Sequence, residues 1–178
     1  IDGGARVYGN IFTEGAHDVN IFGRGEVHPD GRGAGVWVRR SKNVRIDGIV
    51  VSQLPIGQCD SVELTNVKSI SYYGWGDGMD VFSSSNVILD GVFCRNSDDC
   101  AAVYASTQGF KGGSNNVLVK NATLWADVAH PINIGGLGDP NGMDTVQNVT
   151  FRNIDILDQA EKQIDYQGCL AINPGDNT

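Results

Sequence analysis

The chain has 178 residues, of which 40% are hydrophobic, and this suits one globular domain spanning residues 1–178. Its net charge is −8 and it has no basic run, which argues against nucleic acid and anionic membrane surfaces as partners. No apolar stretch of the sequence is long enough to cross a bilayer. Its 24 glycines and its lack of helix-forming segments favour many turns and short strands.

A nine-residue pattern recurs along the chain, with alternating apolar residues around a central glycine or asparagine. It reads N-V-x-φ-x-[G/N]-φ-x-φ, where φ is apolar, and successive copies begin 25, 18, 25, 30 and 32 residues apart. The copies are DVNIFGRGE from Asp18, NVRIDGIVV from Asn43, SVELTNVKS from Ser61, NVILDGVFC from Asn86, NVLVKNATL from Asn116 and NVTFRNIDI from Asn148.

Each copy predicts a strand, a tight turn and a second strand. In the second copy Val44 and Ile46 alternate with polar residues, Gly48 supplies the bend, and Ile49 resumes the alternation. One such unit cannot bury its apolar face alone, whereas stacked units place like residues above like. The sequence patterns of leucine-rich repeats and of β-propellers are absent. We therefore predict an all-β fold in the form of a parallel β-helix.

The two ends of the sequence suggest a piece of a longer chain. It begins at Ile1 without an initiator methionine, and it ends in NPGDNT, which has the composition of a loop. We therefore expect about seven coils without the terminal ones. The unequal intervals between copies predict loops of different length on one side, where solenoids commonly build a binding cleft.

The cysteines show no metal-type C-x-x-C spacing. Cys94 and Cys100 lie in apolar contexts, which predicts buried, unreactive thiols. The sequence leaves open whether disulfides form among Cys59, Cys94, Cys100 and Cys169.

Acidic residues gather in two segments that we expect to form the third strand of neighbouring coils. GWGDGMDVF contains Asp77 and Asp80, and NSDDCAAVY contains Asp98 and Asp99. Asp77 and Asp98 are 21 residues apart, about one coil, so they should stack roughly 4.8 Å from each other. Both members of the adjacent pair reach one cleft only if the backbone bends at 96–99, since neighbouring strand side chains face opposite ways.

Three chemical interpretations of this cluster remain open. Carboxylates in close contact raise one pKa, which provides a protonated acid beside an ionised base, as glycoside hydrolysis requires. Clustered carboxylates also suit a Ca²⁺ ion. Acidic residues in the turns of a solenoid can equally be solvated groups that cap backbone amides.

A histidine lies about one coil further along. His130 opens the segment HPINIGGLG, in which Ile132 and Ile134 alternate as in a strand. It is either a structural residue or an imidazole that hydrogen-bonds a carboxylate and holds a shared proton.

These segments resemble the motifs of the polygalacturonase family of glycoside hydrolases (family 28). The family pattern is N-T-D-G-x-D, then N-x-D-D-C, then G-H-G-L-S-I-G-S-x-G, then R-I-K. Residues 75–80 match the first motif from its aspartate onward, 96–100 match the second in full, and 130–138 match the histidine and several positions of the third. The resemblance implies a right-handed β-helix and an inverting hydrolase of polysaccharides or oligosaccharides, secreted or periplasmic, without a cofactor or metal.

The resemblance also implies roles for individual residues. Asp98 would be the general acid, Asp77 and Asp99 would hold and activate water, and His130 would tune the proton of the acid. An inverting mechanism fits a water-sized gap of about 6.5–9.5 Å between acid and base. We expect substrate contacts from the neighbouring residues Trp75, Asp80, Asn96, Tyr104, Asn133 and Gly135.

The sequence departs from the family pattern in three places. Trp75 and Gly76 replace the Asn-Thr of the first motif, and Pro131 replaces a glycine beside the histidine. The R-I-K segment, whose cations grip a substrate carboxylate in the family, corresponds to GCLAIN at 168–173. Loss of this grip favours a neutral or differently charged glycan.

Other functions remain open as alternatives. The segment LWADVAHP, with Trp125, is similar to dextranase-like enzymes of family 49, which act on neutral glucans. A polysaccharide lyase on the same fold would need Ca²⁺ or a basic side chain together with a uronate. A non-catalytic β-helix would bind glycans without cleaving them. The sequence does not indicate an oligomeric state.

Overall fold

The computed structural model describes residues 1–162 and 168–176, and every regular element in these residues is a β-strand. No helix in this part of the chain is therefore available to cross a membrane. The strands are β1 (Arg6–Tyr8), β2 (Ile11–Glu14), β3 (His17–Phe22), β4 (Glu26–His28), β5 (Val36–Arg39), β6 (Lys42–Asp47), β7 (Val50–Val51), β8 (Ile56–Gly57), β9 (Asp60–Thr65), β10 (Lys68–Ile70), β11 (Val81–Phe82), β12 (Ser85–Asp90), β13 (Phe93–Asn96), β14 (Ala101–Tyr104), β15 (Ser114–Ala126), β16 (Ile132–Gly136), β17 (Val146–Gln159) and β18 (Leu170–Asp176).

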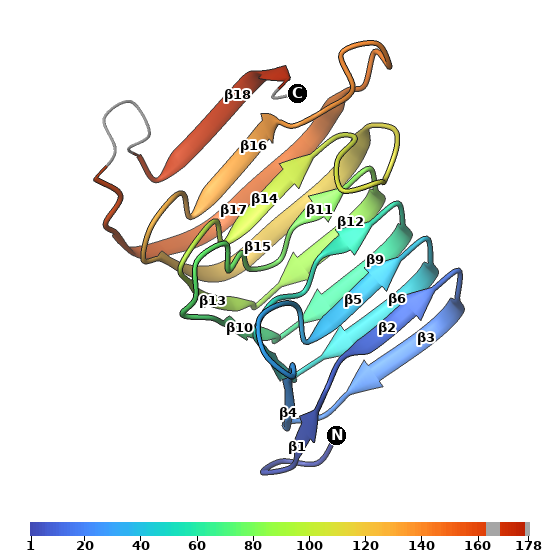
Figure 1. Ribbon diagram of the computed structural model, residues 1–178, viewed down its shortest axis with the longest axis vertical. Coiled ribbons are helices and arrows are strands. Elements are labelled where there is room, and N and C mark those ends of the chain that lie inside the picture. The colour runs from blue at the N-terminus through green and yellow to red at the C-terminus, as the bar shows by residue number, and fades with distance from the viewer. Residues whose placement is uncertain (163–167, 177–178) are drawn as a thin grey trace.

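The named strands pair in parallel, each with the strand one coil earlier or later. One sheet has the order β18-β16-β14-β11-β8-β5-β2, and a larger sheet contains the remaining strands. Figure 1 shows the strands stacked in chain order from the N-terminal end to the C-terminal end. The prediction of an all-β fold with parallel strands is confirmed, and the arrangement is consistent with a parallel β-helix.

The predicted bends lie at the central glycine or asparagine of the repeats. Gly48 and Gly91 have φ angles of 83° and 64°, and Asn66 has 54°, in the left-handed region that these two residue types tolerate. Asn121 and Asn153 adopt the same conformation, yet β15 and β17 run through them without a break. In these two copies the predicted pair of strands is therefore one long strand with a bend.

The core is built from the apolar positions of the repeats. Val44 pairs with Val62, Val62 with Val87, and Val87 with Val117, so that one column of valines runs through successive coils. Their side chains are 1% exposed or less. A second column contains Ile21, Ile46 and Leu64, which is the stacking of like residues that the repeat predicts.

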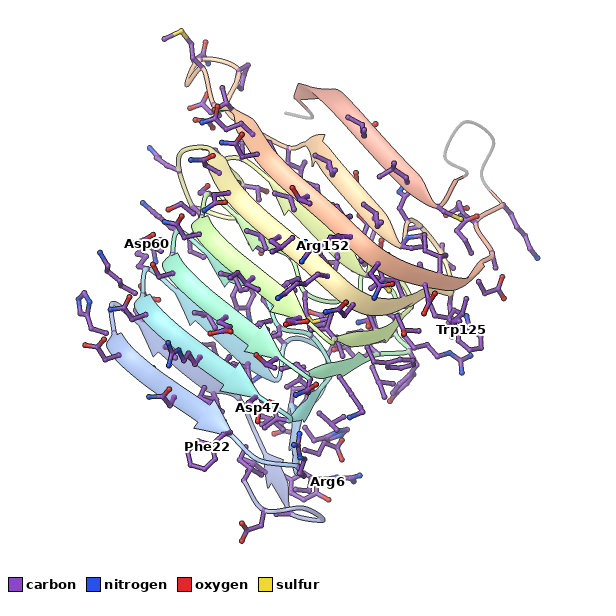
Figure 2. All side chains as sticks on the ribbon, turned by 180° about the vertical axis from the view of Figure 1, so that it is seen from behind. Arg6, Phe22, Asp47, Asp60, Trp125 and Arg152 are labelled. Carbon is purple, nitrogen blue, oxygen red and sulfur yellow. The ribbon has the colours of Figure 1, made fainter. Side chains whose placement is uncertain are left out.

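Polar ladders follow the outer face of the larger sheet, seen from behind in Figure 2. The Asn86 side-chain amide donates to Asp60 at 2.7 Å, and that of Asn116 donates to Asn86 at 2.7 Å. The bond from Asn86 is the main cause that lowers the pKa of Asp60. The asparagine that begins a repeat thus links neighbouring coils in the copies that start at Asn86 and Asn116.

The four cysteines are free thiols. Cys94 and Cys100 are buried, as predicted, and so is Cys59, whereas Cys169 is exposed. Burial raises the pKa of Cys59 to about 11 and that of Cys94 well above its usual range. These buried thiols are therefore protonated and poorly nucleophilic at neutral pH.

Candidate active site

The acidic segments lie on neighbouring coils, immediately before strands of the seven-stranded sheet. The amide of Gly78 donates to the carbonyl of Asp99 at 2.7 Å, and the amide of Cys100 donates to that of His130 at 3.1 Å. Oxygens of Asp77, Asp98 and Asp99 lie within 4.8 Å of one another, close enough to bind one water molecule or one cation together. The structure therefore brings together the three carboxylates that the repeat spacing predicts.

The backbone bends at Ser97 and Asp98, between β13 and β14. Because of this bend, the side chains of Asp98 and Asp99 both line the same cavity. The cavity has a volume of about 320 Å³, at the lower end of the size range of ligand pockets. It is lined by Trp75, Asp77, Asp80, Phe82, Asp98, Asp99, Tyr104, Gln108, Asn133, Gly135, Gly136, Leu137 and Asn173.

A second cavity of about 240 Å³ continues from the first toward the N-terminal coils. The two share Trp75, Asp77 and Phe82 among their lining residues, and the second reaches Trp37 on β5. Together they give an extended surface along the seven-stranded sheet, with the acids near its middle. Such a shape suits a chain of sugars better than a single small molecule.

Asp99 is held firmly although it faces the cavity. It is 3% exposed, and it accepts hydrogen bonds of 2.8 Å each from the Tyr104 hydroxyl, the Asn133 side-chain amide and the His130 backbone amide. Burial raises the pKa of Tyr104 far above its usual range, so its hydroxyl stays a donor. These bonds fix the orientation of the Asp99 carboxylate.

Asp77 and Asp98 titrate close to neutral pH. Burial, followed by the charges of Asp98 and Asp99, raises the pKa of Asp77 to about 7. Burial and then Asp99 raise the pKa of Asp98 to about 6. Near neutral pH the cluster therefore binds a proton among its members while another carboxylate stays ionised, as acid–base catalysis requires.

Asp80 lies deeper than the other acids. It is 4% exposed, and its Oδ1 has no hydrogen-bond partner among the residues that the structure describes. Burial, with the charges of Asp77 and Asp99, raises its pKa well above the usual range. Asp80 is accordingly a neutral acid in the wall of the cavity.

Two predicted site residues lie behind the cavity wall. His130 is 3% exposed, with its Nδ1 3.5 Å from Asp99 Oδ1. Asn96 is fully buried, and its side-chain amide donates to the carbonyl of Asp77 at 2.6 Å. The structure does not bring Asn96 to the cavity, because this side chain points into the coil and holds the backbone of the acidic segment.

Aromatic residues differ in their relation to the cavity. Trp75 lines it and is 86% exposed, and Tyr104 lines it with its ring stacked on Phe82 at 5.8 Å. Trp125 is on the outer face of the larger sheet, labelled in Figure 2, where the Arg95 guanidinium lies 4.1 Å from its ring centroid. Among the described aromatic residues that line this first cavity, Trp75 therefore offers the open stacking face beside the acids.

The sequence analysis missed three polar residues of the site. Asn173 on β18 pairs with Gly135 on β16, so alignment of GCLAIN with the preceding coil could have located it. Gln108 comes from the loop between β14 and β15 and has no pattern that would identify it. Glu161 is buried, and its carboxylate accepts a hydrogen bond from the amide of Ala129, next to His130.

A family model described as "Glycosyl hydrolases family 28" matches residues 35–162. Curated relatives include "Exopolygalacturonase" of Cochliobolus carbonum, 26% identical over 85% of this chain and 38% of the relative. "Exopolygalacturonase X" of Aspergillus niger is 31% identical over 70% of this chain and 24% of the relative. "Probable endo-xylogalacturonan hydrolase A" of Aspergillus fumigatus is 35% identical over 48% of this chain and 18% of the relative.

The chain thus spans less than two fifths of the length of these relatives. No solved structure matches it. The matches support the polygalacturonase resemblance and do not show the dextranase-like one, which stays a prediction.

Proposed function

Because the chain belongs to glycosyl hydrolases family 28, we propose that it is a polygalacturonase-like hydrolase that cleaves glycosidic bonds of a polysaccharide or oligosaccharide. The observation that carries this proposal is the cluster of Asp77, Asp98 and Asp99 in one cavity, within 4.8 Å of one another. Two of these acids titrate near neutral pH. The cluster can thus supply both a proton donor and a proton acceptor.

Each carboxylate has a role in the proposed reaction. Asp98 donates its proton to the glycosidic oxygen as the bond between that oxygen and the anomeric carbon breaks. Asp77 and Asp99 hold a water molecule, which attacks the anomeric carbon and gives its proton to the ionised carboxylate. His130 and Tyr104 hold Asp99 in place, and Trp75 offers a face for a sugar ring.

We further propose inversion at the anomeric carbon. The proposal of inversion rests on the family resemblance. The carboxylate spacing does not support it, because oxygens within 4.8 Å are closer than the carboxyl separation of about 6.5–9.5 Å in most inverting enzymes. The spacing nevertheless suits one shared water, because two acceptors that each bond it at about 2.8 Å lie about 4.6 Å apart.

The proposal includes the finer features of the fold and the setting. We propose a right-handed β-helix, with about seven coils contributed by this chain, in a secreted or periplasmic enzyme. A lyase is less well supported, because neither lysine nor arginine is among the described residues that line the two cavities. A lyase without Ca²⁺ needs such a side chain as its base.

The test is release of reducing ends from a panel of pectic, dextran-type and other plant and bacterial glycans. Asp98→Asn keeps the size of the side chain and should lower turnover by roughly 10²–10⁴-fold, the usual contribution of a general acid. The matched control is Asp155→Asn, the same substitution at an exposed position of β17, and it should keep full activity. Full activity of Asp98→Asn would refute the assignment, and binding without any release of reducing ends would favour the non-catalytic alternative.

A further inference from the structure

The polar side chains that line the candidate active site are carboxylates, amides and a hydroxyl. Apart from the acids and Tyr104, these are Gln108, Asn133 and Asn173. None of the described residues that line this cavity or the adjoining one is a lysine or an arginine. Amides both donate and accept hydrogen bonds, which suits sugar hydroxyls, whereas a carboxylate ligand needs donors or cations.

Two of the amides form a ladder that leads to the catalytic cluster. The Asn173 side-chain amide donates to Asn133 Oδ1 at 3.1 Å, and the Asn133 side-chain amide donates to Asp99 Oδ2 at 2.8 Å. Asn173 is on β18, and it brings an uncharged amide to the wall of the cavity. The end of the cavity at β18 is therefore lined by uncharged side chains that bond to one another.

The cations of the same sheet are engaged elsewhere. The Arg39 guanidinium lies 4.3 Å from the ring centroid of Trp37 and 5.0 Å from that of Phe12. Arg40 forms an ion pair with Glu14 at 2.9 Å. Both arginines belong to the β5 coil, below the coils that carry the acids, and neither is among the residues that line the two cavities.

A uronate in this cavity would place its carboxylate beside several acids, and the described residues that line the cavity include no compensating cation. Like charges repel strongly in a partly desolvated site, and a buried anion without a partner loses its hydration. A sugar with a hydroxymethyl or methyl group in place of the carboxylate has no such cost. Its hydroxyls can instead pair with Gln108 and Asn173.

We propose that the sugar unit bound between the acids and Asn173 is uncharged. The proposal deepens the function proposed above and rests on it for the position of the cleaved bond. Charged units of a mixed polymer would then bind outside the cavity that contains the acids.

The test compares two substrates that differ only in charge, oligogalacturonides and the same oligosaccharides after chemical reduction of their carboxyl groups to hydroxymethyl groups. We expect kcat/KM at least tenfold higher for the reduced form at low ionic strength. A higher kcat/KM for the charged form would overturn the proposal.

A measurement of binding distinguishes failure of this inference from failure of the proposed function. Asp98→Asn is titrated with both oligosaccharides by calorimetry, and the neutral form should bind at least tenfold more tightly. Neutral-form binding by Asp98→Asn, with no hydrolysis by the wild-type protein, would refute the function and keep the inference. Tighter binding of the charged form, or binding of neither, would refute the inference.

A single substitution should reverse the preference. Asn173→Lys places a cation in the cavity and should raise the charged-to-neutral ratio of kcat/KM, or of affinity, at least tenfold. Thr150→Lys adds the same charge at an exposed position of β17 and should leave the ratio unchanged. An equal change in both variants would show a general charge effect and contradict the assignment of Asn173.

Discussion

The Glu161 carboxylate accepts a hydrogen bond from the backbone amide of Ala129 at 3.2 Å, across 32 positions of the chain. Ala129 has a φ of 63°, which is strained for a residue with a side chain, and its carbonyl accepts a bond from the Gln159 side chain at 3.1 Å. The next amide, that of His130, donates to Asp99. The side chains of Gln159, the last residue of β17, and of Glu161, two residues further on, therefore hold the backbone that positions one acid of the cluster.

Glu161 should also influence the proton of the general acid. Burial and Asp99 raise the pKa of Asp98, and the charge of Glu161 raises it further, while His130 lowers it. Glu161→Gln keeps an oxygen for the Ala129 amide and removes the charge. We expect the alkaline limb of the pH–rate profile to move to lower pH, with little change in thermal stability.

The control for this prediction is Glu63→Gln, which removes a carboxylate that pairs with Arg45 on the outer face of the larger sheet. It should leave the profile in place. If Glu161→Gln loses activity equally at every pH, its role is confined to holding the backbone.

The buried acids should make folding stability depend on pH in a defined direction. The raised pKa values of Asp77 and Asp80 mean that the folded protein keeps protons that the unfolded chain releases above pH 4. Stability from these groups is therefore complete at acidic pH and is lost as pH rises toward and beyond neutrality. For Asp77 the loss should be on the order of 2–4 kcal/mol, from its pKa of about 7.

Denaturant unfolding at pH 4.5 and pH 7.5 measures this effect. Exposed acids with lowered pKa values, such as Asp60 and Asp90, act in the opposite direction, so the informative quantity is the difference between wild type and variant. Asp77→Asn should gain stability relative to wild type at the higher pH. An equal difference at both pH values would contradict the burial argument.

The stereochemical course is open to direct observation. Proton NMR of the first product, recorded before mutarotation, should show an anomeric configuration opposite to that of the cleaved bond. Retention would instead mean that one of the closely spaced carboxylates attacks the sugar directly. In that case the covalent intermediate should accumulate with a substrate that has an activated leaving group.

Asn96 should contribute to stability and to the position of Asp77 without contacting substrate. Its side chain donates to the carbonyls of Gly76 and Asp77, at 3.1 and 2.6 Å. The Gly76 carbonyl keeps its bond from the Ser71 hydroxyl, so Asn96→Ala deprives mainly the Asp77 carbonyl of a donor, at a cost of about 1–3 kcal/mol. We expect lower kcat with a nearly unchanged KM. Asn20→Ala, at an exposed position of β3, is the control for unfolding measurements.

A KM that rises more than kcat falls would instead place Asn96 in contact with substrate, as the sequence suggested.

The repeat allowed the catalytic cluster to be predicted because a solenoid converts sequence interval into spatial distance. An interval of 21 residues between Asp77 and Asp98 is one coil here, and the acids do converge. The motif match placed Asn96 among the substrate contacts, whereas alternation along β13 turns this side chain inward with that of Cys94. Gln108 and Glu161 reach the site from irregular segments, where no period relates position in the sequence to position in space.

Gly57 has a consequence for the architecture of the cleft. It lies on the rung below Phe82, and any side chain at this position would overlap the ring of Phe110, which belongs to the loop that carries Gln108. The space beside Gly57 is thus filled by the Phe110 ring, which comes from a loop two coils away. The loop that forms one wall of the binding surface thus packs on a coil that contributes no acid to the cluster. A substitution at Gly57 would therefore disturb the shape of the cleft as well as the scaffold.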